Sequence, residues 1–173
     1  MPNALFIGTT KCGKTTLAKI IAKQLRAAGK KVALTCTICE KKPAVKKSWP
    51  HDIFVPISHL ADYVENGPPS YMFLDEASSY LKSSYPEHQE LAKYCANFHK
   101  YMYVMAQRAK QIPPNTRTQC TALYCFHQLQ PNAKIVVEEF GRGLSVERIT
   151  SLRPGEYYYS RDGFTPAELR RVF

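Results

Sequence analysis

The chain begins with a short apolar run that is followed by a helical pattern. Asn3–Ile7 is apolar and stops at Gly8, which predicts a buried strand. In Gly13–Ala28 apolar side chains recur at helical spacing, cations occupy the other faces, and Gly29 supplies the stop. Lys31–Thr35 then has the pattern of a second strand. This order predicts a strand–helix–strand unit.

The same alternation continues through the middle of the chain. The expected elements are a loop at Glu40–Pro50, a helix at Ile57–Glu65 capped by Ser58, a strand at Tyr71–Leu74, a helix at Glu87–Lys100, and strands at Tyr101–Ala106 and Thr121–Phe126. Lys134–Phe140 and Gly155–Tyr159 are expected to be further, antiparallel strands. The sequence therefore predicts an α/β fold, a mainly parallel sheet flanked by helices with antiparallel strands toward the C-terminus, in one domain over residues 1–173.

Gly8–Thr15 fits the pattern G-x-x-x-x-G-K-[ST] at every fixed position, between the first strand and the first helix. Glycines let the backbone turn its N–H groups toward phosphates, at the positive end of the helix. Lys14 can reach the β- and γ-phosphates, and the Thr15 hydroxyl can bind Mg²⁺. A chance glycine turn is the alternative, which this context disfavours. The predicted ATP-binding residues are Gly8, Thr9, Thr10, Lys11, Cys12, Gly13, Lys14, Thr15 and Thr16.

Polar side chains follow two of the later strands. Asp75 and Glu76 end the apolar strand Tyr71–Leu74, so Asp75 is expected to hold Mg²⁺ and Glu76 to polarise the attacking water. A charge pair in the first turn of a helix is the alternative. Gln107 ends the next strand, where it can sense the γ-phosphate or simply leave the sheet as a polar residue.

Composition and charge narrow the class of protein. The 173 residues carry 24 Lys and Arg against 14 Asp and Glu, a formal net charge of +10, which favours a polyanionic partner. No apolar run approaches the roughly 18–20 residues of a membrane span, and the N-terminal apolar stretch is too short for a secretory signal. The six cysteines are therefore expected to be reduced thiols.

Two further groups of residues are open to more than one interpretation. Four lysines in the Glu40–Pro50 loop are candidates for DNA binding, with a solvated loop as the alternative: Lys41, Lys42, Lys46 and Lys47. Cys36 and Cys39 have the spacing of a zinc half-site, but no matched second pair follows, and small buried hydrophobes are favoured.

Taken in order, the motifs resemble the FtsK/HerA superfamily of DNA-pumping ATPases, most of all the small genome-packaging ATPases of tailless icosahedral viruses. The resemblance rests on Gly8–Thr15, Asp75-Glu76, Ala106-Gln107-Arg108, Ile112–Arg117, the strand Thr121–Phe126 and Leu152–Tyr157. Ala109 stands where many members have a proline, so the resemblance does not determine the local backbone path or the placement of Arg117.

The resemblance implies a role for each matching residue. Lys14 and Thr15 would bind ATP and Mg²⁺, Asp75 would be the Walker B carboxylate, Glu76 the catalytic base and Gln107 the γ-phosphate sensor. Arg117 would be the arginine finger lent to a neighbouring subunit. The alternatives for that finger are Arg108, Arg142, Arg148 and Arg153.

The resemblance also implies a hexameric ring with double-stranded DNA in its channel. Such a motor packages viral DNA into a preformed capsid, docks on capsid vertex proteins, and acts in the host cytoplasm or on the virion rather than after secretion. A small nucleoside or nucleotide kinase is an alternative, since it shares this size and loop. A Zot-like phage assembly ATPase is another.

Overall fold

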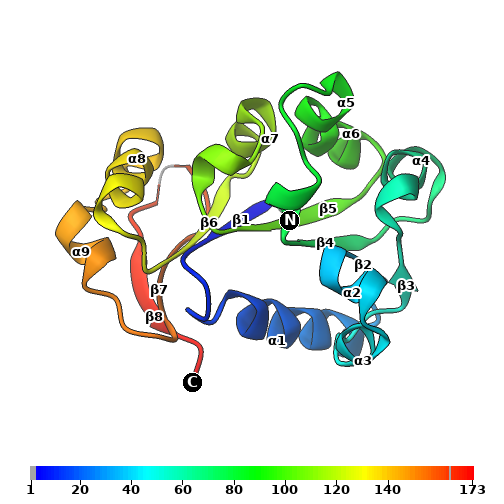
Figure 1. Cartoon of the computed structure of the whole chain (residues 1–173), viewed down its shortest axis with the longest axis horizontal. Coiled ribbons are helices and arrows are strands. Elements are labelled where there is room, and N and C mark those ends of the chain that lie inside the picture. Colours follow the sequence, from blue (N-terminus) through cyan, green and yellow to red (C-terminus); the bar gives the residue numbers. More distant parts are fainter. Residues whose placement is uncertain (1–2, 164) are drawn as a thin grey trace.

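The computed structural model describes residues 3–163 and 165–173, and its centre is one eight-stranded sheet (Figure 1). The strands are β1 (Ala4–Ile7), β2 (Val32–Cys36), β3 (Ile53–Phe54), β4 (Tyr71–Asp75), β5 (Tyr101–Ala106), β6 (Ala122–Phe126), β7 (Glu156–Ser160) and β8 (Glu168–Arg171). They lie in the order β3-β2-β4-β5-β1-β6-β7-β8, parallel from β3 to β6 and antiparallel beyond. The predicted fold class is confirmed. Met1, Pro2 and Phe164, which the single-domain prediction includes, lie outside the described residues.

Helices cover both faces of this sheet (Figure 1). The α-helices are α1 (Lys14–Ala27), α2 (Thr37–Lys41), α3 (Pro43–Lys47), α4 (Leu60–Asn66), α5 (Pro86–Gln89), α6 (Leu91–Asn97), α7 (Pro114–Thr118), α8 (Gln130–Phe140) and α9 (Val146–Thr150). Three short 3-10 turns are η1 (Ile57–His59), η2 (Ala77–Ser79) and η3 (Ala109–Gln111). Helix α1 runs along one face, and α6, α7 and α8 lie on the other.

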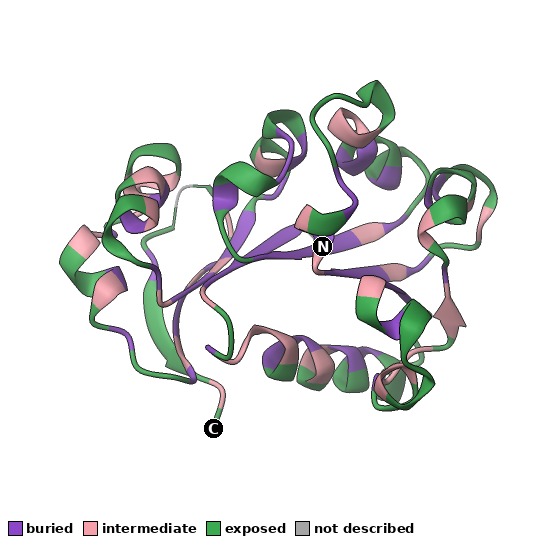
Figure 2. Cartoon of the chain, in the orientation of Figure 1, coloured by how far each residue is buried: buried purple, intermediate pink, exposed green. Residues whose placement is uncertain are grey.

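The central strands are buried on both faces, because each face carries its own apolar core (Figure 2). Along β1, Leu5 and Ile7 join the core under α6 and α8, whereas Phe6 joins the core under α1. Both cores are closed to solvent, since all three side chains are fully buried. The sheet is therefore a rigid platform for whatever lies at its edges.

The strand order brings the ends of β4, β1 and β5 to one edge of the sheet. Ile7, the last residue of β1, pairs with Ala106, the last residue of β5, and Cys36 pairs with Asp75 between β2 and β4. Parallel strands present their carboxyl ends at the same edge, which is where open α/β sheets bind ligands. Gly8, Glu76 and Gln107 directly follow these strand ends.

Two predictions about the segment after β2 are wrong. Glu40–Pro50 holds α2 and α3 instead of a loop, because the Cys36 Sγ accepts the Cys39 N–H at the start of α2 and Pro43 opens α3 at a position that suits proline. Cys36 and Cys39 form a disulfide, so not all six cysteines are thiols. Among the described residues, no three potential ligands gather in a way that would hold a metal ion.

The helical segments on the other face also depart from prediction. Lys134–Phe140 lies in α8, not in a strand, because Ala133, Val136, Val137 and Phe140 face the core at helical spacing. The predicted helix Glu87–Lys100 divides into α5 and α6, and the predicted helix at 57–65 divides into η1 and α4. Ser58 lies inside η1 and caps neither. Helices α7 and α9 and strand β8 had no clear signal in the pattern.

Candidate active site

The loop between β1 and α1 wraps around the Lys14 side chain. The Lys14 Nζ donates to the carbonyl oxygens of Gly8, at 2.6 Å, and Thr9, at 2.8 Å. Gly13 has a φ of 108°, a conformation that glycine adopts without strain. A Cβ at Gly8 would lie 2.5 Å from the Cβ of Phe126, so only glycine fits there. These contacts explain both fixed glycines of the motif.

Residues outside the motif hold the loop in place. The Thr9 N–H donates to the His127 carbonyl oxygen at 2.9 Å, and the Thr9 hydroxyl lies 3.3 Å from Nδ1 of that histidine. On the other flank, the Gly155 N–H donates to the Cys12 carbonyl oxygen at 3.0 Å. Sequence reasoning missed His127 and Gly155, because such supports are recognisable only once β6 and β7 are placed beside β1.

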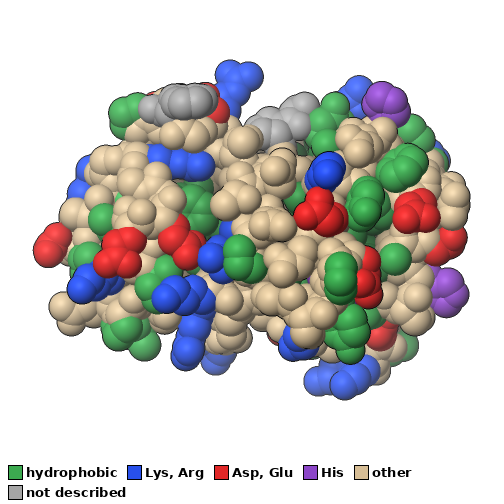
Figure 3. Space-filling model, turned by 90° about the horizontal axis from the view of Figure 1, so that it is seen from above, with side chains coloured by type: hydrophobic (Ala, Val, Ile, Leu, Met, Phe, Trp, Pro, Cys, Tyr) green, Lys and Arg blue, Asp and Glu red, His purple; other side chains and the backbone are tan. Residues whose placement is uncertain are grey.

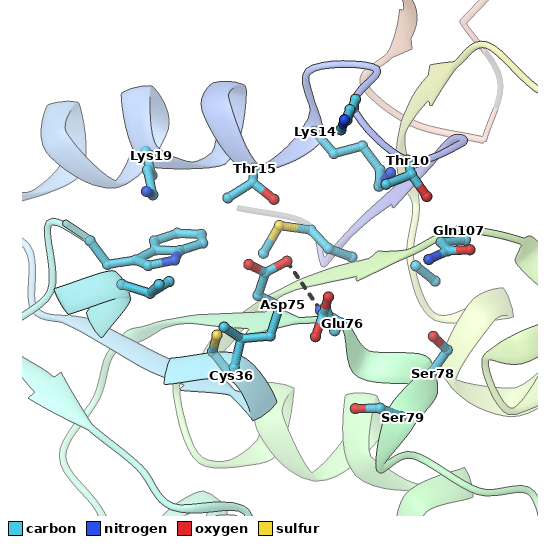
Figure 4. Close-up of a pocket in the computed structure, with 16 residues that line it drawn as sticks. Thr10, Lys14, Thr15, Lys19, Cys36, Asp75, Glu76, Ser78, Ser79 and Gln107 are labelled. Atoms are coloured by element: carbon cyan, nitrogen blue, oxygen red, sulfur yellow. Dashed lines mark hydrogen bonds between the residues drawn. The ribbon is translucent and has the colours of Figure 1, made fainter. Parts of the chain in front are cut away.

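A cavity of about 410 Å³ opens beside this loop (Figure 4). Seven of the predicted site residues line it: Thr10, Lys11, Lys14, Thr15, Asp75, Glu76 and Gln107. Thr15 and Asp75 point toward one another across it, from α1 and from the end of β4 (Figure 4). Ser78 and Ser79 of η2 and Lys19 of α1 also line it, and sequence reasoning did not select them.

Asp75 is the most perturbed acid of the site. Its side chain is 9% exposed, and burial raises the pKa of Asp75 to about 6, with a further rise from the charge of Glu76. The Glu76 N–H, which donates to Asp75 Oδ1 at 3.1 Å, and the charges of Lys14 and Lys19 oppose this rise of the pKa. No ion pair to Asp75 forms within the described chain. A buried carboxylate opposite a threonine hydroxyl fits Mg²⁺, which prefers oxygen ligands.

Glu76 has an unusual backbone conformation. Its φ of 53° is left-handed, which is rare for a residue with a side chain. Strain of this kind persists where the surrounding structure imposes it, and it gathers at functional sites. The turn sends the chain from β4 into η2 and leaves the Glu76 side chain half-buried in the wall of the cavity.

Gln107 is exposed and is held through its backbone. Its carbonyl oxygen accepts a hydrogen bond from Nε2 of Gln128 at 3.0 Å. Gln128 is fully buried, so this bond ties the end of β5 to the segment that enters α8. Sequence reasoning missed Gln128, which carries no motif of its own.

Arg117 lies in α7 and does not line the cavity. Its Nη2 lies 2.8 Å from Oε1 of Glu139, and its Nη1 donates to the carbonyl oxygen of Ile112 at 2.8 Å. The guanidinium is therefore engaged within its own chain, and the finger role stays a prediction. Among the alternatives, Arg108 and Arg153 are exposed, and Arg148 bonds to Tyr158 and Gly143. Arg142 is half-buried, and burial lowers its pKa.

The four lysines predicted to bind DNA lie on and between α2 and α3, outside the cavity. Lys41, Lys42 and Lys47 are exposed. The Lys46 Nζ lies over the ring of Phe54, 3.9 Å from the ring centroid, and makes a cation–π contact with it. These positions suit a surface role, which stays a prediction.

A second cavity, of about 310 Å³, lies on the other side of the loop. It is lined by Lys11–Thr16 together with Pro154, Gly155 and Phe173. The Phe173 ring is 84% exposed and packs against Gly155, where a Cβ would lie 2.7 Å from the ring. An exposed aromatic ring beside a phosphate-binding loop can stack on a planar base.

Solved structures share this fold over almost the whole chain. The genome packaging NTPase B204 from Sulfolobus turreted icosahedral virus 2, in complex with ATP-gammaS, has a TM-score of 0.79 at 13% identity and covers 99% of this chain and 98% of its own. The DNA-packaging ATPase B204 from Sulfolobus Turreted Icosahedral Virus has a TM-score of 0.79 at 14% identity, with 98% and 97% covered. VirB4 of Thermoanaerobacter pseudethanolicus has a TM-score of 0.73 at 9% identity, with 99% and 89% covered. The resemblance to this kind of ATPase is confirmed in the fold.

A family model identifies the chemistry of the chain, although no curated protein matches the sequence. Residues 4–126 match the ATPase family associated with various cellular activities (AAA), a range that contains the phosphate loop, Asp75, Glu76 and Gln107. This match covers more than half of the chain. Together with the fold that the chain shares with solved ATPases, it shows that the protein hydrolyses ATP. The chain belongs to the AAA family of ATPases.

Proposed function

We propose that this ATPase is a DNA translocase that packages viral double-stranded DNA into a preformed capsid as a hexameric ring. The observation that carries the proposal is the fit to B204, a genome packaging NTPase, which covers 99% of this chain and 98% of that one. The shared fold extends over nearly the full length of both chains in that comparison, whereas it covers only 59% of the coupling protein TcpA. The net charge of +10 suits a polyanionic substrate.

Within this proposal each side chain of the cavity has a task. Lys14 and the loop N–H groups bind the phosphates, and Thr15 and Asp75 hold Mg²⁺, which when bound neutralises charge on the phosphate oxygens. Glu76 accepts a proton from the attacking water, and Gln107 orients that water against the γ-phosphate. Phe173 flanks the base on the other side of the loop.

A neighbouring subunit completes the site in the proposed ring. Arg117 of the same chain does not line the cavity, and its guanidinium is paired with Glu139 instead. An arginine from the adjoining subunit would supply positive charge to the transition state. Arg108 and Arg153 are exposed and free of ion pairs within the described residues, so they join Arg117 as candidates.

The test measures ATP hydrolysis per chain across protein concentrations, with and without duplex DNA. We expect the rate per chain to rise with concentration and with DNA, because the site is shared between subunits. A rate per chain that is independent of concentration and DNA would contradict the translocase. Phosphate transfer to a nucleoside, with little release to water, would identify a kinase instead.

A matched variant tests the role of Glu76. Glu76→Gln keeps the size of the side chain and removes its basicity, so we expect hydrolysis to fall by about 10²–10⁴-fold while a non-hydrolysable ATP analogue still binds. Unchanged hydrolysis would remove Glu76 from the mechanism.

The proposed location follows from the proposed role. No helix within residues 3–163 and 165–173 is long and apolar enough to cross a membrane. We place the motor in the host cytoplasm or on the virion, where capsid vertex proteins would dock it. Detection of the chain in purified particles by mass spectrometry tests the second location.

A further inference from the structure

A groove of about 500 Å³ runs along α1, in addition to the two cavities beside the phosphate loop. Thr16, Lys19, Lys23 and Arg26 line it from one side, and their spacing of three and four residues places them on one stripe of the helix. Lys47, at the end of α3, lines the opposite wall. The groove is therefore formed by α1 and the end of α3, two helices that β2 and α2 separate in sequence.

The charge of this groove has one sign. Its lining includes four cations and no acidic side chain. Arg26 is paired with Asp52 at 2.9 Å. Lys19 donates to the Ser48 hydroxyl at 2.8 Å, and Lys19, Lys23 and Lys47 have no ion pair to an acid among the described residues. On the face that carries α5 to α8, by contrast, acidic and basic side chains are interspersed (Figure 3). A groove lined by one sign of charge raises the local concentration of a polyanion.

Trp49 supplies a second and independent observation. Its ring is 3% exposed, and no acceptor lies within hydrogen-bonding distance of its Nε1 in the described part of the chain. Buried donors without an acceptor are rare in folded proteins. Trp49 lines this groove and the ATP cavity alike, and the Lys19 Nζ lies 5.5 Å from its ring centroid. A ligand rich in acceptor oxygens would pair with the lysines, and it would reach the indole N–H only if the Trp49 side chain shifts on binding.

The length of the stripe matches a nucleic acid backbone. Four residues separate Lys19 from Lys23, the two cations of the stripe without an acidic partner, which is about 6 Å along a helix. One strand of duplex DNA advances about 3.4 Å per nucleotide along its axis, and its successive phosphates are farther apart than that, so these two lysines can contact about two phosphates. Such contacts hold the backbone without reading sequence, as a packaging motor requires.

We propose that this groove, lined by Lys19, Lys23 and Lys47 and floored in part by Trp49, binds the phosphate backbone of one DNA strand. The inference rests on the proposed translocase. Lys19 and Trp49 line both the groove and the ATP cavity, so a bound strand and a bound nucleotide would contact the same two side chains. The DNA contact is thus placed beside α1, not on Lys41 and Lys42, which do not line the groove.

The first arm of the test uses two charge-matched variants. Lys23→Gln/Lys47→Gln removes two exposed groove cations, and Lys93→Gln/Lys134→Gln removes two exposed cations of α6 and α8. The affinity for labelled duplex DNA is measured over a range of salt concentrations. We expect the slope of log K against log salt to become shallower by about 2 in the groove variant only. Equal slopes in the two variants would overturn the proposal.

The second arm uses the fact that Trp49 is the single tryptophan of the chain. Without nucleotide, duplex DNA should change the tryptophan emission of the wild type and of the α6/α8 variant, but not that of the groove variant at the same concentration. Phosphatidylserine vesicles that change the emission while DNA does not would assign the groove to a membrane. A change of solution mass in the groove variant without DNA would assign it to a subunit contact. Both outcomes overturn the proposal.

The two proposals fail in different ways. If DNA binds through the groove but does not stimulate ATP hydrolysis, the translocase is wrong and the groove remains a DNA site. If DNA stimulates hydrolysis with the same affinity and salt slope in the groove variant, the translocase stands and the groove is wrong. Binding of a non-hydrolysable ATP analogue, equal in all variants, serves as the control for folding.

Discussion

Asp75 and Arg117 are both charged side chains withdrawn from solvent, and their surroundings differ. Arg117 is 12% exposed, and its guanidinium is paired with Glu139 and bonded to backbone carbonyls. Asp75 is 9% exposed, lacks an ion pair within the described residues, and has a raised pKa. A buried charge that is paired within the chain is costly to separate from its partner, whereas one without an ion pair is available to a ligand. By this criterion Asp75 is poised to bind a ligand, whereas a finger role for Arg117 would first require its contacts with Glu139 and the carbonyls to open.

The largest expected effect is on catalysis at Asp75. Asp75→Asn keeps the shape of the side chain and removes the charge that would hold Mg²⁺, so we expect ATP hydrolysis to fall by at least about a hundredfold. Hydrolysis measured against Mg²⁺ concentration checks this, with the surface variant Asp62→Asn as control. If Asp75→Asn hydrolysed ATP as fast as the wild type, Asp75 would not be a metal ligand.

Asp75→Asn should lower ATP hydrolysis but raise the free energy of unfolding. Because the pKa of Asp75 is about 6 in the fold against an ordinary 3.8, the folded state retains a proton that the unfolded state has lost between these values. Stability from this group therefore falls as pH rises from about 4 to about 6. Without Mg²⁺ and nucleotide, Asp75→Asn should be more stable than the wild type by about 1–3 kcal/mol at pH 7.

Thermal unfolding at two pH values checks this difference. The stability advantage of Asp75→Asn should disappear near pH 4, where both states of the wild type hold the proton. A variant that is less stable than the wild type at pH 7 would mean that the Asp75 charge is satisfied within the chain.

The smallest expected effect concerns Arg117. Its contacts predict that Arg117→Ala lowers the free energy of unfolding by about 1–3 kcal/mol, and that Glu139→Gln lowers it by less, since the backbone carbonyls still hold the guanidinium. Denaturant unfolding measures both. An arginine finger would show itself differently, through rescue of Arg117→Ala subunits on mixing with Lys14→Ala subunits. Such rescue without any loss of stability would support the finger role of Arg117 and contradict a structural one.

The part of the site that the sequence predicts well is local. Gly8, Lys14 and Thr15 lie within one turn of chain, so their spacing determines their geometry, and Asp75 and Gln107 follow because parallel strands end at one edge. His127 supports Thr9 from 118 residues away in sequence, and Gln128 supports Gln107 from 21 residues away. Only the packed structure reveals such contacts.

Errors in the fold have a common physical cause. Lys134–Phe140 is rich in residues that favour strands, but its core-facing positions follow a helical period once α8 packs on the sheet. In the same way, the polar composition of Glu40–Pro50 conceals two short helices that depend on the disulfide partner Cys36 and on Pro43. Tertiary context overrides local preference in both segments.

The close approach of Gly8 to Phe126 has a consequence for nucleotide exchange. Because no atom can be inserted between them, the floor of the phosphate loop is set by β6 and is as immobile as the interior of the sheet. We therefore expect a spent nucleotide to leave through displacement of the other walls, α2 and α3 with the η2 turn, while the loop keeps its position. In the proposed motor, the phosphate loop on β6 would be the fixed wall of the site, and α2, α3 and η2 the moving walls.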